Sequence, residues 1–132
     1  MAVRFPAATR NAMVDAWGAL ADGGSVEIRT GSQPASASDA ATGTLLATIT
    51  LNADAFTAAS TGSASLNTAT TLTTTAAAGG TAGWARVKGS GGATVFDGSV
   101  GTSGADFTIN STTITSGSTV NLTGGTITQP AG

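Results

Sequence analysis

The sequence contains no cysteine, histidine or tyrosine. Without cysteine no disulfide framework can form, and without cysteine and histidine the chain lacks the usual ligands of a zinc site. Catalytic arrangements that depend on a histidine or a cysteine are excluded for the same reason. A serine–lysine pair would have to use Lys88, the only lysine, which lies beside a glycine-rich turn. We therefore expect neither an enzyme nor a bound metal or cofactor.

Charged and bulky apolar side chains are also scarce. Five basic and seven acidic residues make up 9% of the chain, against about 25% in an average soluble domain. Leu, Val, Ile and Phe number 23 of the 132 residues, slightly below the roughly 20% that is associated with disorder. Disorder also requires a high net charge, whereas the net charge here is −2. We therefore predict a folded domain with a thin core, which gains stability by burying surface against partner subunits.

Threonine, serine, alanine and glycine fill most of the remaining positions. Threonine is β-branched and favours strands, and the 19 glycines disfavour helix interiors. We predict one domain over residues 1–132, with an arm at 1–8, a helix at 9–22, strands at 25–128 and a free tail at 129–132. Because turn signals recur every 8–12 residues or so, the predicted fold is all-β. It is a jelly roll or β-sandwich of about seven or eight short antiparallel strands with one N-terminal helix.

The predicted helix has one apolar face. Its apolar residues recur at i, i+3, i+4 and i+7, and they are Met13, Ala16, Trp17 and Leu20. We expect this face to pack on a sheet, with ligand stacking as the alternative role for the tryptophan. Thr9 is predicted to cap the N-terminus through its hydroxyl, and two consecutive glycines end the helix.

Two strands have patterns that predict further detail. Residues 25–30 alternate apolar and charged side chains, which indicates a half-buried strand on whose solvent face Glu27 and Arg29 can pair. In the last strand, Ile127 is out of phase with the apolar residues before it. The glycines at 124–125 are a suitable place for a β-bulge that resets the register.

The chain is organised around a predicted β-hairpin over residues 84–100. The glycine-rich turn 89–92 joins its two arms and can adopt the positive φ angles that such a turn requires. Trp84, Arg86 and Lys88 share one face of the first arm. Which face is inside is open, because an inward Trp84 requires Arg86 to be paired or to extend to the sheet edge.

The predicted recognition surface combines this hairpin face with the N-terminal arm. Tryptophan and arginine are enriched at the energetic centres of protein interfaces, and the arm carries a cation beside an aromatic residue. The candidate interface residues are Arg4, Phe5, Trp84, Arg86 and Lys88. The alternative for the arm is a terminus that lies on its own domain. Nucleic acid is not an expected partner, because five basic residues and a net charge of −2 do not supply the basic patch that phosphate binding requires.

Acidic and uncharged segments suggest no further site. Asp97 and Asp106 can approach across a turn, as paired-carboxylate glycosidases require, but a chance proximity of polar residues is the simpler interpretation. The glycines match neither a phosphate-binding loop nor a dinucleotide fingerprint. Residues 55–85 carry no charge but are rich in threonine, serine and glycine, so no membrane partner is expected.

Several short segments resemble a widespread family of small structural proteins of tailed phages. In chain order they are residues 2–16 (AVRFPAATRNAMVDA), 31–34 (GSQP), 43–48 (GTLLAT), 80–84 (GTAGW), 95–101 (VFDGSVG) and 126–132 (TITQPAG). The segments are distributed over nearly the whole chain. Some members of this family are similar to head cement (capsid decoration) proteins, which have a jelly-roll-like β fold and clamp neighbouring capsid subunits.

The resemblance implies a virion protein on the outer surface of the phage head. Its partners would be the major capsid protein and further copies of the chain, in a homodimer or homotrimer. The resemblance implies no enzymatic activity and identifies no site residues. The alternative is a tail-fibre or tail-accessory protein that binds a host receptor or glycan. A hydrolase domain of a fibre is disfavoured by the missing histidine and the scattered acids.

Overall fold

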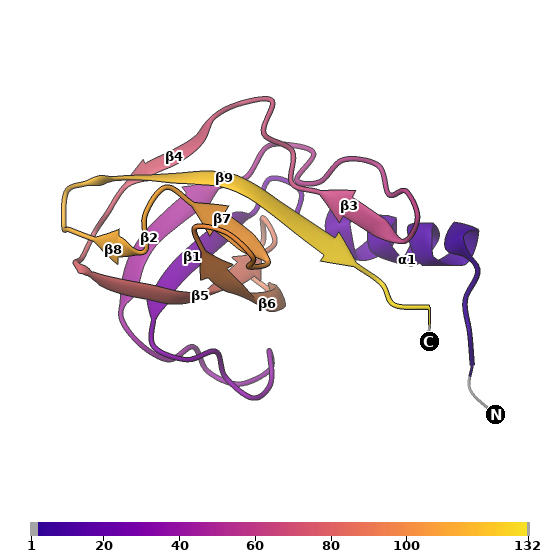
Figure 1. Ribbon diagram of the computed structural model, residues 1–132, viewed down its shortest axis with the longest axis horizontal. Helices are drawn as coiled ribbons and strands as arrows, with labels where there is room; N and C mark the ends of the chain where they lie inside the picture. Colours follow the sequence, from indigo (N-terminus) through magenta and orange to yellow (C-terminus); the bar gives the residue numbers. More distant parts are fainter. Residues whose placement is uncertain (1–2, 132) are drawn as a thin grey trace.

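The computed structural model describes residues 3–131, which form one helix and nine strands (Figure 1). The elements are α1 (Ala7–Ala19), β1 (Ser25–Thr30), β2 (Leu45–Thr50), β3 (Ser63–Ser65), β4 (Leu72–Thr75), β5 (Gly80–Lys88), β6 (Thr94–Gly101), β7 (Phe107–Ile109), β8 (Thr113–Ile114) and β9 (Thr119–Thr128). The prediction of a mostly β fold with one N-terminal helix is therefore confirmed.

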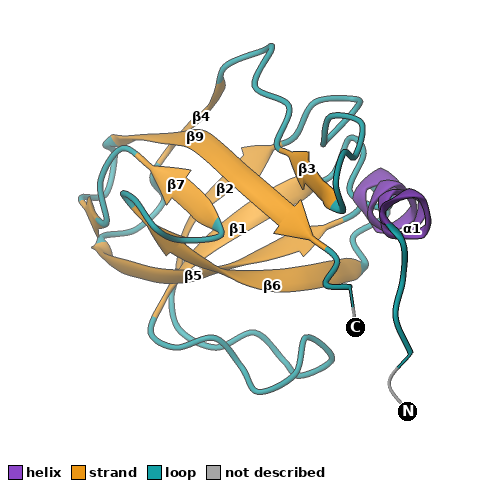
Figure 2. Ribbon diagram, turned by 45° about the vertical axis from the view of Figure 1, so that its right-hand side comes forward, coloured by secondary structure: helices purple, strands orange, loops and turns teal. Residues whose placement is uncertain are grey.

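The strands form one curled, mixed sheet. Its order is β2-β1-β5-β6-β7-β9-β3, with β4 also paired to β9 and β8 to β5. The segment after β4 returns to β2, where the amide of Ala77 donates to the carbonyl of Leu46 at 2.8 Å, so the sheet curls back on itself (Figure 2).

One strand pair departs from the predicted antiparallel arrangement. β6 and β7 are parallel, although only a short segment connects them. Ser99 and Asp106 close this segment, because the Asp106 amide donates to Ser99 Oγ at 2.9 Å and the Ser99 amide donates to Asp106 Oδ2 at 2.9 Å. The chain therefore loops around and continues in its original direction.

The core lies inside the curl. Val26 and Ile28 of β1 are fully buried there, while the charged residues that alternate with them, Glu27 and Arg29, point outward, as the pattern predicted. The rings of Phe96 and Phe107 stack with their centroids 5.9 Å apart. The chain has few large apolar side chains, and most of those in the strands pack in this core.

β9 changes the face that it buries part-way along its length. Leu122 and Ile127 are both buried although they are five positions apart in a strand. The pairing of β7 with β9 shifts register at this point and leaves Thr123 without an opposite residue. A Cβ at Gly125 would lie 2.8 Å from the ring of Phe107, so the close approach requires glycine. The predicted bulge is therefore confirmed.

The helix begins two residues earlier and ends three residues earlier than predicted. Pro6 is the N-cap residue, with φ −67°, and no side chain caps the helix. The prediction that Thr9 caps it is wrong, because the chain already turns into the helix after Pro6, whose carbonyl accepts from the Arg10 amide at 3.1 Å.

The helix also buries a different face from the predicted one. Val14 and Gly18 are buried, whereas Leu20 is 64% exposed and Ala16 is exposed. Val14 packs with Ile127 of β9 and a neighbouring residue of β3. The reason for the difference is that α1 lies beside the sheet rather than across it (Figure 2), so that only one side of the helix is covered.

The two ends of the described chain run together beyond the body of the sheet (Figure 1). The amide of Phe5 donates to the carbonyl of Ala131 at 2.7 Å, and the amide of Gln129 donates to the carbonyl of Gly62 at 2.8 Å. The prediction of a free tail is wrong for residues 129–131, because these backbone groups are paired. The parts of the predicted arm and tail at 1–2 and 132 lie outside the described residues.

Candidate functional site

A buried ion pair lies on the outer face of the predicted hairpin. In the register of β5 and β6, Arg86 stands opposite Asp97. Arg86 donates from Nε to Asp97 Oδ1 at 2.7 Å and from Nη2 to Oδ2 at 3.0 Å, which is a bidentate pair. The two side chains are only 5% and 2% exposed. The hydrogen bond to Asp97 raises the pKa of Arg86, although burial opposes it.

Further charged side chains extend this pair into a network across β1, β5 and β6. Glu27 binds Arg29 and Lys88, each at 3.3 Å, so the predicted pairing of Glu27 with Arg29 is confirmed. The guanidinium of Arg86 lies 5.4 Å from the centroid of the Trp84 ring, within range of a cation–π contact. Two buried donors of the network, Arg29 Nε and Trp84 Nε1, have no partner among the described residues.

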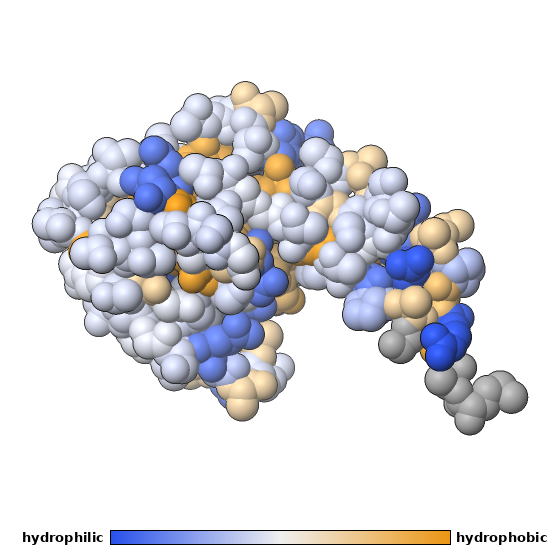
Figure 3. Space-filling view, in the orientation of Figure 1, coloured by the Kyte–Doolittle hydropathy of each residue, from blue (hydrophilic) through white to orange (hydrophobic). Residues whose placement is uncertain are grey.

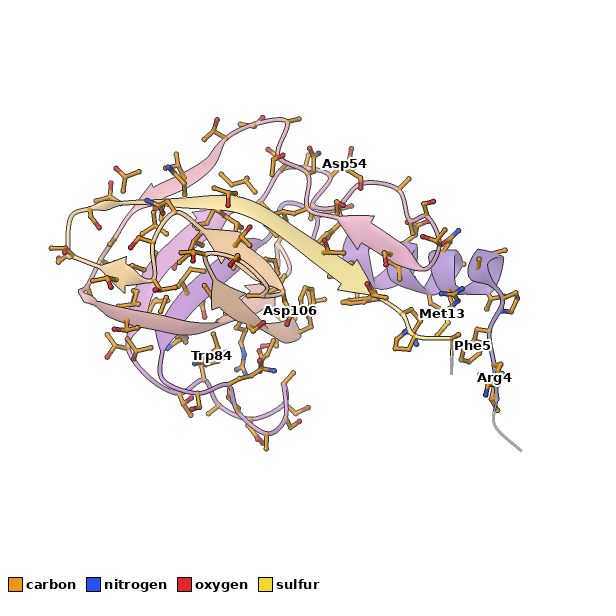
Figure 4. All side chains as sticks on the ribbon, viewed as in Figure 1. Arg4, Phe5, Met13, Asp54, Trp84 and Asp106 are labelled. Atoms are coloured by element: carbon orange, nitrogen blue, oxygen red, sulfur yellow. The ribbon has the colours of Figure 1, made fainter. Side chains whose placement is uncertain are left out.

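The loop between β1 and β2, residues 31–43, covers this outer face. Trp84 lies on the side of β5 toward this loop (Figure 4) and is completely buried. Thr30 and Thr44 close the base of the loop, since the Thr44 amide donates to Thr30 Oγ1 at 2.8 Å. Asp39 in the loop is near enough to contribute to the raised pKa of Arg86.

These positions change the predicted interface. The hairpin forms as predicted, but Trp84 and Arg86 are buried inside the folded chain, so a partner cannot touch them. Their prediction as interface anchors is therefore wrong for this structure, because the loop covers the face on which they lie. Lys88 remains partly accessible, with its side chain 31% exposed.

The N-terminal arm presents the accessible part of the predicted interface. Val3 is 72% exposed, Arg4 is exposed and Phe5 is partly buried. Arg10 fixes the base of the arm by donating from Nε to the carbonyl of Phe5 at 3.2 Å. Within residues 3–131, no hydrogen bond or ion pair holds the side chain of Arg4. Figure 4 places Arg4 and Phe5 at the end of the molecule, beyond the helix.

A hollow that we call the notch opens between α1 and the sheet. It has a volume of about 220 Å³, and its lining residues are Trp17, Phe96, Asp97, Asp106, Thr126, Ile127 and Thr128. Trp17 meets Phe96 edge to face with 5.1 Å between ring centroids. Figure 3 shows the concavity between the projecting helix and the rest of the molecule. The notch therefore combines two aromatic rings and one large aliphatic side chain with polar residues.

The two acids of the notch have different surroundings. Asp97 is committed to Arg86, whereas Asp106 is exposed and accepts from the amide and hydroxyl of Ser99 at 2.9 and 3.2 Å. Both line one hollow, as their possible approach across a turn suggested. Because one of them is held in an ion pair, the arrangement favours recognition over acid–base chemistry.

A smaller hollow of about 90 Å³ lies on the other side of α1, and three acids are among its lining residues. Asp15 accepts from the Ala59 amide and Asp22 accepts from the Ala55 amide, both at 2.8 Å. These carboxylates fasten the segment after β2 to the helix. No group of three or more metal-ligating side chains within the described range 3–131 could hold a metal ion.

Sequence reasoning did not identify the notch. Trp17 was expected to pack the helix on a sheet, with ligand stacking as the alternative, and Phe96 lay on a strand whose inner face was ambiguous. The helical pattern around Trp17 and the strand pattern around Phe96 are both readable in the sequence, but no local signal indicates that residues 17, 96 and 127 meet. Only the pairing of β9 beside α1 brings them together.

No protein-family model, curated protein or solved structure matches the chain. Within residues 3–131, no helix combines the length and apolar character needed to cross a membrane. The function must therefore be inferred from the surface and from the sequence resemblance.

Proposed function

We propose that the chain is a structural protein of a tailed-phage virion, and specifically a cement (decoration) protein. In this role it binds the outside of the assembled head and stabilises contacts between major capsid subunits. The observation that carries the proposal is the projecting N-terminal arm, on which the apolar Val3 and the cationic Arg4 are both exposed. The resemblance of six sequence segments to small phage structural proteins supports the same role.

The physical mechanism is preferential binding to the assembled state. A protein that binds only the assembled lattice stabilises it by about 2.7 kcal/mol when its free concentration is about a hundredfold above Kd. A net charge of −2 allows many copies to lie close together with little mutual repulsion. Most of the exposed surface consists of uncharged threonine, serine, alanine and glycine, which is compatible with dense packing on a shell.

The proposed anchors are Arg4 and Phe5 of the arm, with Lys88 as a peripheral contact. An extended arm can reach a neighbouring subunit without moving the sheet. Trp84 and Arg86 contribute indirectly, since they hold the outer face of the sheet together.

Purified virions and particles that lack the protein test the proposal. We expect a reconstruction of the virion to place hundreds of copies on the head, and added protein to bind particles that lack it. Arg4→Glu combined with Phe5→Ala should weaken this binding at least tenfold. Asp54→Asn, which changes an exposed acid on another side of the molecule, should not weaken it. A few copies at the tail, and none on the head, would instead support the tail-accessory alternative with a receptor or glycan as ligand.

A further inference from the structure

The notch has the chemistry of a receptor for an apolar and cationic segment. Trp17, Phe96 and Ile127 are among its lining residues, and so is the exposed Asp106. None of its lining residues is basic. An occupant with a positive charge beside apolar side chains would therefore complement the aromatic and aliphatic side chains of the notch and the charge of Asp106.

The chain itself carries one segment of this kind. Its five basic residues are Arg4, Arg10, Arg29, Arg86 and Lys88. The last three belong to the network on the outer face of the sheet, and Arg10 donates to backbone carbonyls of Phe5 and Thr61. Arg4 is therefore the cation that is left without a partner in the described part of the chain, and it is flanked by Val3 and Phe5.

The arm does not occupy the notch of its own chain. It is bound at Phe5 to the carbonyl of Ala131 and to Arg10, which directs it away from the sheet (Figure 4). The arm joins the N-terminal end of the 13-residue helix, whereas Trp17 of the notch lies near its C-terminal end. A second molecule does not have this restriction.

We infer that two copies of the chain associate by exchanging arms, with residues 3–5 of each copy seated in the notch of the other. Antiparallel packing of the two helices places each arm beside the C-terminal half of the other helix, where the notch opens. The same packing covers Ala16 and Leu20, which are exposed in the single chain, and Met13, which is partly exposed (Figure 4). The contact is isologous, so every interaction occurs twice.

The two-fold repetition doubles the area that the proposed contact buries. A stable specific interface buries about 1,200 Å² or more in total, which one three-residue arm cannot supply. Two arms and two helix faces together include four aromatic side chains, from Phe5 and Trp17 of each copy. Aromatic residues and arginine are the side chains that commonly dominate binding energy.

Charge reversal tests the exchange by sedimentation and light scattering. Arg4→Glu and Asp106→Arg should each weaken self-association about tenfold or more, because each places like charges together at both contacts. An equal mixture of the two variants should restore dimers, since both arm–notch pairs are then complementary again. Asp54→Arg is the matched control and should leave association unchanged.

Disulfide trapping gives a second readout, because the chain has no native cysteine. A Val3→Cys variant mixed with a Thr126→Cys variant should form a mixed disulfide under mild oxidation. Val3→Cys mixed with Ser116→Cys should not, because residue 116 is exposed but does not line the notch. Disulfide trapping tests whether the arm of one copy lies in the notch of another even where Asp106→Arg perturbs folding.

A wild-type chain that remains monomeric at about 100 µM would overturn the inference. So would dimers that persist in both charge variants, or a mixture that fails to associate while both variants remain folded. Arg4 and Phe5 are also the proposed capsid anchors, so the exchanged dimer is inferred for the free chain, and its arms leave the notches when the chain binds the head. Self-association is measured on the purified chain alone, whereas the capsid role is measured on particles.

Discussion

Removing the carboxylate of Asp97 should destabilise the fold strongly. Asp97→Ala leaves the guanidinium of Arg86, whose side chain is 5% exposed, without either of its two charge-assisted hydrogen bonds. Breaking a buried ion pair by removing one partner costs about 3–5 kcal/mol. Since small domains are stable by about 5–15 kcal/mol, this change should remove a large fraction of the total stability.

Urea denaturation at neutral pH measures the effect. We expect the midpoint to fall while the dependence on urea concentration stays nearly constant, because the same surface is exposed on unfolding. The pKa of Arg86 is raised by its hydrogen bond to Asp97. Stability that arises from a raised pKa is complete below the unfolded value and is lost only as the pH rises through the folded value. Because both values lie far above neutrality, the ionisation of Arg86 should not make the measured cost vary near pH 7.

Two further variants separate the buried pair from ordinary surface electrostatics. Lys88→Met removes a pair with Glu27 in which the lysine is 31% exposed, and it should cost at most about 1 kcal/mol. Arg86→Met combined with Asp97→Leu should recover much of the loss, because no unpaired charge is left buried. If Asp97→Ala costs no more than Lys88→Met, the reasoning from burial is wrong.

Two other substitutions test how closely the chain is packed. Gly24→Ala places a Cβ 1.9 Å from the carbonyl oxygen of Lys88. It should lower the free energy of unfolding by about 1–3 kcal/mol or more, because it forces the backbone apart. Gly91→Ala is the control, since nothing lies within 4 Å of its added Cβ, and it should leave the urea midpoint unchanged. Phe107→Ala removes a core ring that is 1% exposed and should lower the free energy of unfolding by about 3–5 kcal/mol. A loss below about 1 kcal/mol in the same assay would show that the core is not organised around this ring.

Local patterns predicted the elements of this fold well. The alternation in residues 25–30 identified β1 and its charged face, and the glycines near the end of the chain marked the bulge in β9. These features depend on neighbouring residues along one strand. They are readable from sequence because a strand alternates its side chains between two faces and because glycine permits close approach.

The interface residues were harder to predict, because exposure depends on long-range contacts. Trp84 and Arg86 resembled surface anchors, but the loop at 31–43 covers them, and nothing in its serine- and alanine-rich sequence indicates this. The face of α1 was misassigned for a related reason. Val14 is buried by β3 and β9, which are distant in sequence, while Leu20 faces solvent despite its place in the apolar pattern.

The scarcity of charge links the stability of the fold to its proposed binding. Three of five cations are held in the network on the sheet, and Arg10 is held by backbone carbonyls. The exposed acids are distributed over several sides of the molecule, whereas Arg4, the exposed arginine of the arm, lies at one end. In a chain of average charge, one arginine would be a small part of the surface potential. Here the same arginine, placed on a projecting arm beside apolar residues, is the feature that can direct one molecule to a specific place on another.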